Sequence, residues 1–260
     1  MACAQLTICP LGSGSRGNCL YVGSPAGAVL IDVGFSARET RRRLKVAGLD
    51  ETSILGLLIT HEHGDHIGGL GALSRALKVP VWLTRGTYHA VGKPELPEVR
   101  HFLAGDSFCV GPLTIETVPL PHDAADPVAF VVSWEGRRVG NVTDLGHPTS
   151  LVIDRFRGCD FLVLEANHDV GMLLDGPYPW PVKQRIRGRS GHLSNEQSGE
   201  LLEAVLHPGL QGLVLAHLSE VNNHPELALD LIRGVLAAQG FEQLPLWAAE
   251  LHHPLCGLSV

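Results

Sequence analysis

A short segment rich in histidine and aspartate, residues 60–66, has the residue types and spacing of a metal-binding site. Its sequence, THEHGDH, places three imidazoles and two carboxylates within six residues. Imidazole and carboxylate ligands together suit Zn, Mn or Fe. His61 and His63 can face one point of an extended or turning backbone, and Asp65 and His66 can face a second point one turn later. The segment therefore predicts two neighbouring metal sites, in preference to a polar turn with surface histidines.

The residues on either side of this segment indicate where it lies in the fold. An apolar run, ILGLLI at 54–59, comes directly before it, and an apolar, glycine-rich stretch, IGGL at 67–70, follows. The run is typical of a buried strand, and the change to polar residues marks its end. We therefore expect the segment on a strand-to-helix turn, at the carboxyl end of a sheet strand, where α/β folds bind their ligands.

Other acids and histidines stand where further predicted strands stop. Any one of them alone could be an ordinary cap or a surface turn, and Asp32 in particular could cap its strand or orient a metal-binding histidine. A dinuclear centre needs about six or seven ligands and gains from a carboxylate that bridges both ions. Several such strand ends therefore predict a single rim that gathers metal ligands. The residues at these strand ends are Asp32, His122, Asp144, Glu165, His168 and His217.

The hydrophobic pattern predicts two sheet-rich halves, each with helices, and capping boxes at 36–39 and 194–197 begin two of the helices. This order favours an α/β fold in which two mixed sheets pack face to face with helices outside, in one domain over residues 1–260. Strands are expected at about 4–9, 18–23, 28–33, 54–59, 81–83, 100–103, 107–110, 113–118, 128–134, 137–142, 161–164 and 212–216, with a short terminal strand. Helices are expected at about 36–47, 65–77, 149–156, 194–206 and 225–239, with a helix-rich segment at 167–187.

Composition and charge narrow the class of protein. The chain has 260 residues and a hydrophobic content of 45%, enough for one sizeable core. Its formal net charge of −7 gives no global sign of nucleic-acid binding, although a local basic patch is sufficient for that. The six cysteines are scattered, as in a protein with reduced thiols. No signal peptide or run of about 20 apolar residues is present, so we expect a cytoplasmic protein without a membrane segment.

Two segments have residues that could contact a phosphate-containing substrate. The loop PLGSGSRGN at 10–18 offers small hydroxyls and backbone N–H groups for an anion, although a plain hairpin loop is the alternative. Segment 183–189 carries a cation at every second position and follows two aromatic residues that could stack on bases; the alternative is a solvated basic segment. The expected substrate contacts are Ser13, Ser15, Asn18, Tyr178, Trp180, Lys183, Arg185, Arg187 and Arg189.

Taken together and in this order, the motifs resemble the metallo-β-lactamase superfamily, and within it the bacterial YycJ/WalJ-type exonucleases. The matching segments are GSGSRGN at 12–18, THEHGDH at 60–66, PHDA at 121–124, TDLG at 143–146, LEANHD at 164–169, GPYPW at 176–180, GHLSN at 191–195 and LAHLS at 215–219. The resemblance implies a four-layer αβ/βα sandwich. The short segments between the later motifs leave no room for a projecting tRNA-holding arm or an inserted β-CASP-type domain.

The resemblance also implies a ligand set for two divalent ions, Mn or Zn. His61, His63 and His122 would bind one ion, and Asp65, His66 and His217 would bind the other. Asp144 would bridge the two ions, and Asp32 would orient a ligand. True zinc β-lactamases have a cysteine where this chain has Asp144, so antibiotic hydrolysis is not expected.

The implied activity is 5′→3′ hydrolysis of DNA by a hydroxide that the two metals activate. Asp65 would accept the proton of the attacking water, and His192 would protonate the leaving 3′ oxygen or hold the phosphate. His168 would contact substrate or only orient a neighbouring loop. Nothing in the sequence reads base edges, so little sequence specificity is expected.

Other substrates and functions stay open at this point. RNA is an alternative substrate, because His192 also lies in a pattern similar to that of the tRNA-processing nuclease RNase Z. A metallohydrolase of a thioester, lactone or cyclic nucleotide is a second alternative. A non-catalytic DNA-binding protein with a structural metal is a third, although closed structural zinc sites use only four ligands. The sequence carries no signal for the oligomeric state.

Overall fold

The first half of the chain, together with one short strand near residue 258, forms one of two mixed sheets. The computed structural model describes residues 5–260. The strands of the first sheet are β1 (Thr7–Gly12), β2 (Cys19–Ser24), β3 (Gly27–Ile31), β4 (Ile54–Leu58), β5 (Val81–Thr84), β6 (Val99–Phe102) and β14 (Leu258–Ser259). They lie in the order β14-β1-β2-β3-β4-β5-β6. Strands β3 to β6 run parallel to one another, so their carboxyl ends meet at one edge.

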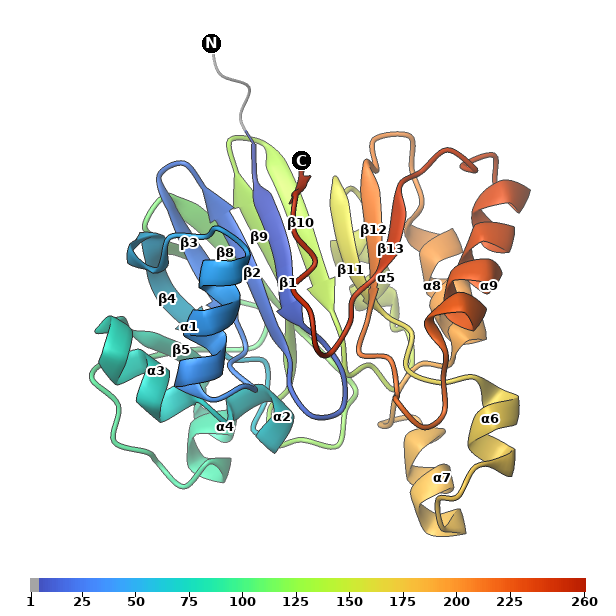
Figure 1. The fold of residues 1–260 in the computed structure, drawn as a ribbon, viewed down its shortest axis with the longest axis horizontal. Helices are drawn as coiled ribbons and strands as arrows, with labels where there is room; N and C mark the ends of the chain where they lie inside the picture. Colours follow the sequence, from blue (N-terminus) through green and yellow to red (C-terminus); the bar gives the residue numbers. More distant parts are fainter. Residues whose placement is uncertain (1–4) are drawn as a thin grey trace.

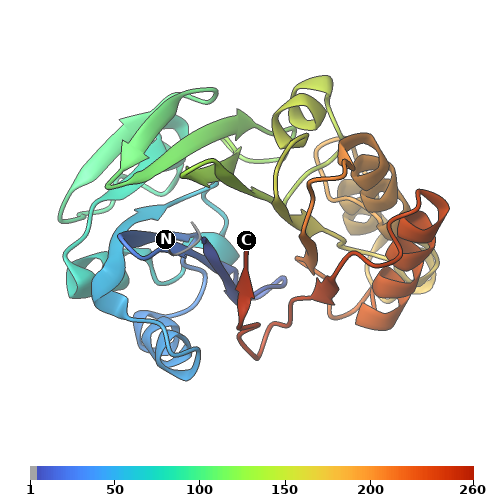
Figure 2. The same ribbon diagram turned by 90° about the horizontal axis from the view of Figure 1, so that it is seen from above.

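The second half of the chain forms a sheet of the same size. Its strands are β7 (Ser107–Val110), β8 (Leu113–Pro119), β9 (Val128–Trp134), β10 (Arg137–Val142), β11 (Phe161–Glu165), β12 (Gly212–Ala216) and β13 (Leu246–Ala248). They lie in the order β13-β12-β11-β10-β9-β8-β7, and β10 to β13 are parallel. The two sheets pack face to face (Figures 1 and 2), which confirms the predicted architecture.

Most of the helices cover the outer faces of the two sheets. The helices are α1 (Ala37–Val46), η1 (Glu51–Ser53), α2 (Gly64–Ile67), α3 (Leu70–Leu77), α4 (Arg85–Ala90), α5 (Ser150–Phe156), α6 (Val170–Asp175), α7 (Trp180–Ile186), α8 (Asn195–Val205) and α9 (Pro225–Ala238). Figure 2 shows α1 outside the first sheet and α8 and α9 outside the second, whereas α6 and α7 lie below the edge of the second sheet in Figure 1. Within residues 5–260, none of the helices has the length and apolar composition to cross a membrane.

The strands are apolar on both faces because both faces are covered. In β9, Val128, Phe130 and Val132 pack between the two sheets. The residues between them, Ala129 and Val131, instead pack under the helices of the second sheet. A strand buried on both sides reads as a continuous apolar run and not as an alternation. This packing explains why short apolar runs predicted the strands well.

The helix predicted over 65–77 is wrong as a single helix, because the chain is interrupted at Gly68 and Gly69. A Cβ at Gly69 would lie 1.9 Å from the carbonyl oxygen of Phe35, and one at Gly68 would lie 2.8 Å from that of Gly34. The Gly69 N–H donates to the Val33 carbonyl at 2.8 Å. This close approach of two backbones requires glycine and divides the segment into α2 and α3.

The boundaries of two predicted strands also differ from the structure. The first strand starts at residue 7 and continues to residue 12, whereas 4–9 was predicted; residue 4 lies outside the described part of the chain. Pro10 fits inside β1 because β14 pairs only with Thr7 and Ile8, which leaves Pro10 on a free edge. Strand β3 ends at Ile31 because Asp32 has a left-handed backbone, with φ 62°. The helix-rich segment predicted at 167–187 is confirmed, since it contains the two short helices α6 and α7.

The packing between the sheets generates a first prediction. Phe130 is fully buried between them and contacts Phe102 edge-on, with 5.9 Å between ring centroids. We expect Phe130→Ala to lower the free energy of unfolding by about 3–5 kcal/mol, because it leaves a cavity in the core. Denaturant unfolding followed by circular dichroism measures the change. Leu103→Ala, at a side chain that is 66% exposed, serves as the control and should change stability by less than about 0.5 kcal/mol. Equal stabilities of the two variants would contradict the described core.

Candidate metal centre

The predicted ligands gather at one rim of the two sheets, the edge at which α2 lies in Figure 1. The first sheet contributes the loops that follow β3 and β4, and the second contributes the loops that follow β8, β10, β11 and β12. In the parallel part of each sheet the strands end on the same side, so their loops meet. Among the described residues, ligand atoms within 4.8 Å of one another form four overlapping groups that could hold a metal ion: His61, His63 and His122; Asp65, His66 and His217; His61, His66 and Asp144; and Asp144, Glu165, His192 and His217.

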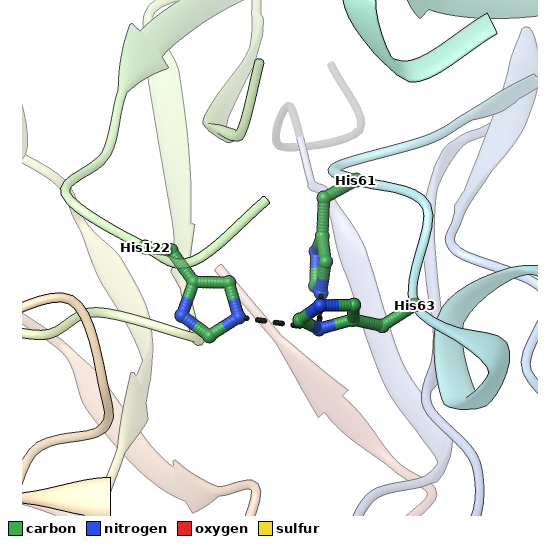
Figure 3. A group of neighbouring side chains, drawn as sticks. All are labelled: His61, His63 and His122. Atoms are coloured by element: carbon green, nitrogen blue, oxygen red, sulfur yellow. Dashed lines mark hydrogen bonds between the residues drawn. The ribbon is translucent and has the colours of Figure 1, made fainter. Parts of the chain in front are cut away.

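The first group consists of His61, His63 and His122. His63 Nδ1 lies 3.0 Å from His61 Nε2 and 3.3 Å from His122 Nε2. Figure 3 shows the three rings converging, with His61 and His63 on the loop after β4 and His122 on the loop after β8. Burial lowers the pKa of His61 well below its ordinary value and also lowers that of His122. Both rings are therefore neutral near pH 7, which is the form that binds a metal.

The second group consists of Asp65, His66 and His217. Asp65 Oδ2 lies 3.3 Å from both His66 Nε2 and His217 Nε2. Asp144 lies between this group and the first one. Its Oδ2 is 3.4 Å from His66 Nε2, and its Oδ1 is 3.5 Å from His217 Nε2 and 3.9 Å from His122 Nε2. Asp144 is therefore the one carboxylate of these groups that approaches ligands of both.

The donor set fits divalent cations. Asp144 Oδ2 is buried and accepts no hydrogen bond from the described residues. A buried polar atom without a partner is costly, and charged atoms are the most costly. A cation at this position would remove that cost, and imidazole and carboxylate are ligands for Zn and Mn. The groups thus have the donors, the burial and the unsatisfied oxygen of a metal centre.

Three of the strand-end residues adopt a backbone conformation that is rare for residues other than glycine. The φ angles are 62° at Asp32, 60° at Asp144 and 56° at His217. Each residue directly follows, or lies within two residues of, the end of β3, β10 or β12. Such conformations cost on the order of 1 kcal/mol or more and persist where the surrounding structure holds them. At this rim they turn the chain sharply while the side chain stays among the ligands.

Asp32 is hydrogen-bonded to a residue of the second group. It accepts hydrogen bonds from the Thr60 N–H at 2.9 Å and from the Thr60 hydroxyl at 2.9 Å. His66 Nδ1 lies 2.8 Å from Asp32 Oδ2 and donates to it. This bond orients the ring, so that His66 Nε2 faces Asp65 and Asp144.

Glu165 has a supporting role that the sequence analysis did not assign. It is fully buried and accepts hydrogen bonds from His192 Nδ1 at 2.8 Å, from the Leu145 N–H at 2.9 Å and from the Leu193 N–H at 3.2 Å. Burial raises the pKa of Glu165, but the charges and hydrogen bonds of His192 and His217 outweigh it and hold the pKa at about 2. The feature of the sequence that pointed to Glu165 was its position at the end of an apolar strand.

The Gly/Ser loop holds ligand loops together. Ser13 and Asn18 are buried, and the Ser13 hydroxyl donates to Asn18 Oδ1 at 2.9 Å. The same hydroxyl accepts the His217 N–H at 2.8 Å, and Asn18 Nδ2 donates to Asp65 Oδ2 at 3.3 Å. These contacts differ from the expected exposure to substrate phosphate. Only Ser15, of the three expected contacts in this loop, is exposed.

Lys183 and Arg185 do not form the open cationic track that was expected. The Lys183 side chain is buried, and its Nζ donates to the Leu174 carbonyl at 2.6 Å, because α7 folds back on α6. The Lys183 ammonium group therefore binds the protein's own backbone and is not presented to a substrate. Arg185 is exposed but forms an ion pair with Asp123.

The other members of the predicted substrate surface are more accessible. Arg189 is exposed and donates to His147 Nε2 at 3.0 Å. The Arg187 side chain is exposed and forms no hydrogen bond or ion pair with the described residues. Trp180 is 57% exposed at the start of α7, and Tyr178 is half-buried. Helix α7 projects from the lower edge of the second sheet in Figure 1.

His168 lies beside the site but contacts none of the candidate ligands. Its side chain is buried, and Nδ1 has no hydrogen-bond partner among the described residues. Its backbone is held by the next segment, since its carbonyl accepts the Asn195 N–H at 2.9 Å. Burial lowers the pKa of His168 to about 4.

Comparisons with known proteins agree with this geometry. Residues 12–164 match the family model of the metallo-beta-lactamase superfamily. The chain is 37% identical to the exodeoxyribonuclease YycJ of Bacillus anthracis over 235 residues, which cover 89% of each chain. It is 33% identical to the exodeoxyribonuclease WalJ of Streptococcus pneumoniae over 224 residues, which cover 84% of this chain and 83% of that one.

A solved structure shows the same fold at low sequence identity. The metallo-beta-lactamase fold protein YhfI from Bacillus subtilis superposes with a TM-score of 0.74 at 15% identity, covering 97% of this chain and all of YhfI. At that identity the likeness concerns the fold alone. The family model and the two relatives, which match most of the chain, carry the assignment: this chain belongs to the metallo-β-lactamase superfamily, in the group that contains YycJ and WalJ.

Proposed function

We propose that this protein is a metal-dependent nuclease that hydrolyses phosphodiester bonds, and that it removes nucleotides from the 5′ end of DNA. The observation that carries the proposal is Asp144, which approaches two ligand groups at once and lies 3.8 Å from His192 Nδ1. The relatives named exodeoxyribonuclease support DNA as the substrate. RNA is the second candidate.

The proposed centre holds two divalent ions, Mn or Zn. His61, His63 and His122 would hold one ion, and Asp65, His66 and His217 the other, with Asp144 between them. When bound, such ions lower the pKa of a water molecule and offset negative charge on a phosphate. This is the chemistry that phosphodiester hydrolysis requires.

The protein's own residues would handle the protons. Asp65 Oδ2 is partly exposed and can take a proton from the attacking water. His192 is held through Nδ1 by Glu165, and its Nε2 has no partner among the described residues. His192 can therefore donate a proton from Nε2 to the leaving 3′ oxygen.

The proposed substrate surface lies on and after α7. Arg185, Arg187 and Arg189 are exposed there, as is Trp180. Arginines that contact phosphates make binding sensitive to salt, and an exposed aromatic ring can stack on a base of any type. We therefore propose binding through the backbone with little sequence specificity, by a single domain that acts in the cytoplasm.

Removal of the shared carboxylate tests the metal centre. We expect Asp144→Asn to bind less metal at both positions, because Asp144 approaches ligands of both groups. Elemental analysis after dialysis against Mn or Zn gives the number of ions per chain, and circular dichroism checks the fold. Asp154→Asn, the same change at an exposed position in α5, is the control and should bind as much metal as the wild type. Full metal content in Asp144→Asn would sink the assignment of Asp144.

DNA oligonucleotides labelled at either end test the activity. We expect the metal-loaded wild type to release mononucleotides from the 5′ end, and Asp144→Asn to be slower by more than about 100-fold, since loss of a metal ligand costs several kcal/mol of transition-state stabilisation. Gel or chromatographic analysis of the products measures both rate and polarity. Release from the 3′ end would contradict the proposed polarity. If neither DNA nor RNA is cut with either metal, the nuclease proposal is wrong.

A further inference from the structure

We propose that a cavity beside the candidate catalytic site binds a second phosphate group of the substrate strand, in addition to the phosphate that is cleaved. The cavity has a volume of about 270 Å³. It is lined by His168, Val170, Arg187, Ser194, Glu196 and Gln197. The proposal deepens the nuclease function and rests on it, because it assigns a place to the part of the strand next to the scissile bond.

His168 provides a hydrogen-bonding group that the protein itself does not use. Its side chain is only 1% exposed, and Nδ1 is buried without a partner among residues 5–260. A buried polar atom that stays unpaired is costly, so such an atom is expected to have a ligand as its partner. The backbone of His168 pairs with that of Ser194, which holds the ring in the wall of the cavity.

Arg187 supplies a positive charge to the same cavity. The neighbouring cations are engaged: Lys183 with a backbone carbonyl, Arg185 with Asp123, and Arg189 with His147. Arg187 has no such partner in the described part of the chain, although it lines the cavity. A guanidinium has the planar set of donors that matches a phosphate group.

The amino terminus of α8 adds a third element that favours an anion. The helix has 11 residues and starts at Asn195, so the positive end of its dipole lies at the cavity. The Ser194 hydroxyl accepts the Gln197 N–H, and the His168 carbonyl accepts the Asn195 N–H. The Glu196 N–H between them donates to no described residue and can donate to a ligand.

Glu196 is the acidic member of the lining and opposes an anion. Its side chain is exposed and can turn toward solvent. The negative charge of Glu196 still makes the electrostatic potential in the cavity less positive. Removing this charge should therefore strengthen the binding of a phosphate. Loss of the Arg187 charge should weaken phosphate binding, whereas loss of the Glu196 charge should strengthen it. These opposite effects make the proposal testable.

The position of the cavity ties it to the proposed reaction. His168 follows Glu165 by three residues, and Ser194 follows His192 by two. The two segments that hold the Glu165–His192 pair thus continue directly into the wall of the cavity. A strand whose scissile phosphate reaches His192 can place an adjoining phosphate in the cavity. That phosphate is either the monoester at the 5′ terminus or an internal diester.

Cleavage rates with 5′-phosphorylated and 5′-hydroxyl oligonucleotides test the proposal. We expect Arg187→Ala to lower kcat/KM by roughly 10- to 100-fold, the range for losing a charged hydrogen bond, and Glu196→Gln to raise it. Arg233→Ala removes an exposed arginine on α9 and is the matched control. If the terminal monoester binds, the wild type prefers the phosphorylated end and Arg187→Ala loses the preference. If an internal phosphate binds, Arg187→Ala lowers kcat/KM by the same factor for both substrates.

Binding measured without cleavage separates this proposal from the nuclease proposal. In the Asp144→Asn background, which should not cleave DNA, fluorescence anisotropy should show weaker DNA binding after Arg187→Ala and tighter binding after Glu196→Gln. His168→Asn, checked by thermal unfolding, should also weaken binding. If Arg187→Ala behaves like Arg233→Ala and Glu196→Gln changes nothing, the phosphate site is wrong, even when the wild type cuts DNA. If these effects appear but the wild type cuts no nucleic acid, the nuclease proposal is wrong and the phosphate site remains.

Discussion

The arrangement of the rim depends on the burial of one carboxylate, Asp144. Burial would raise the pKa of this group, but the charges of His217 and His66 outweigh it and hold the pKa well below its usual value. The buried carboxylate thus depends on several other ionisable groups, which are crowded together between two apolar sheets. A divalent cation among them would satisfy the carboxylate oxygen that lacks a partner, so the protein's need for charge compensation and its proposed chemistry coincide.

A cluster of this kind needs rigid support, and the two sheets supply it. Their strands are packed on both faces, with Phe130 and Phe161 between the sheets and Leu213 and Leu215 under the helices. A site built at the ends of such strands is positioned more precisely than one on long loops. The left-handed backbone at the strand-end residues concentrates the strain where the surrounding core can hold it.

Contacts between distant segments complete the support. The Ser13 hydroxyl joins the first loop of the chain to His217, although 204 residues separate them. The carbonyl of Gly191 accepts from His122 Nδ1 at 3.1 Å, which joins the loops after β8 and before α8. The bond to His122 Nδ1 leaves His122 Nε2 directed at the other ligands. The bond to the His217 N–H holds the loop that carries His217 beside them. The metal centre is thus a property of both sheets together.

The sequence by itself determined the fold class, the strand ends and the ligands at them. These features are local: a short apolar run identifies a buried strand, and the polar residue after it identifies an end. His61, His63, Asp65 and His66 could be recognised because they lie within a few residues of one another. The interruption at Gly68 was missed because its cause is the backbone of Gly34, which is distant in the sequence.

Only the tertiary structure decided which side chains are free and which are engaged. Lys183 and Arg187 look alike in an alternating basic segment, yet one is buried against the Leu174 carbonyl and the other lines a cavity with His168. Glu165 and His192 are paired only because β11 and the segment before α8 lie side by side. Spacing along the chain carries no information about such partners, because a hydrogen bond depends on distances of about 3 Å in space.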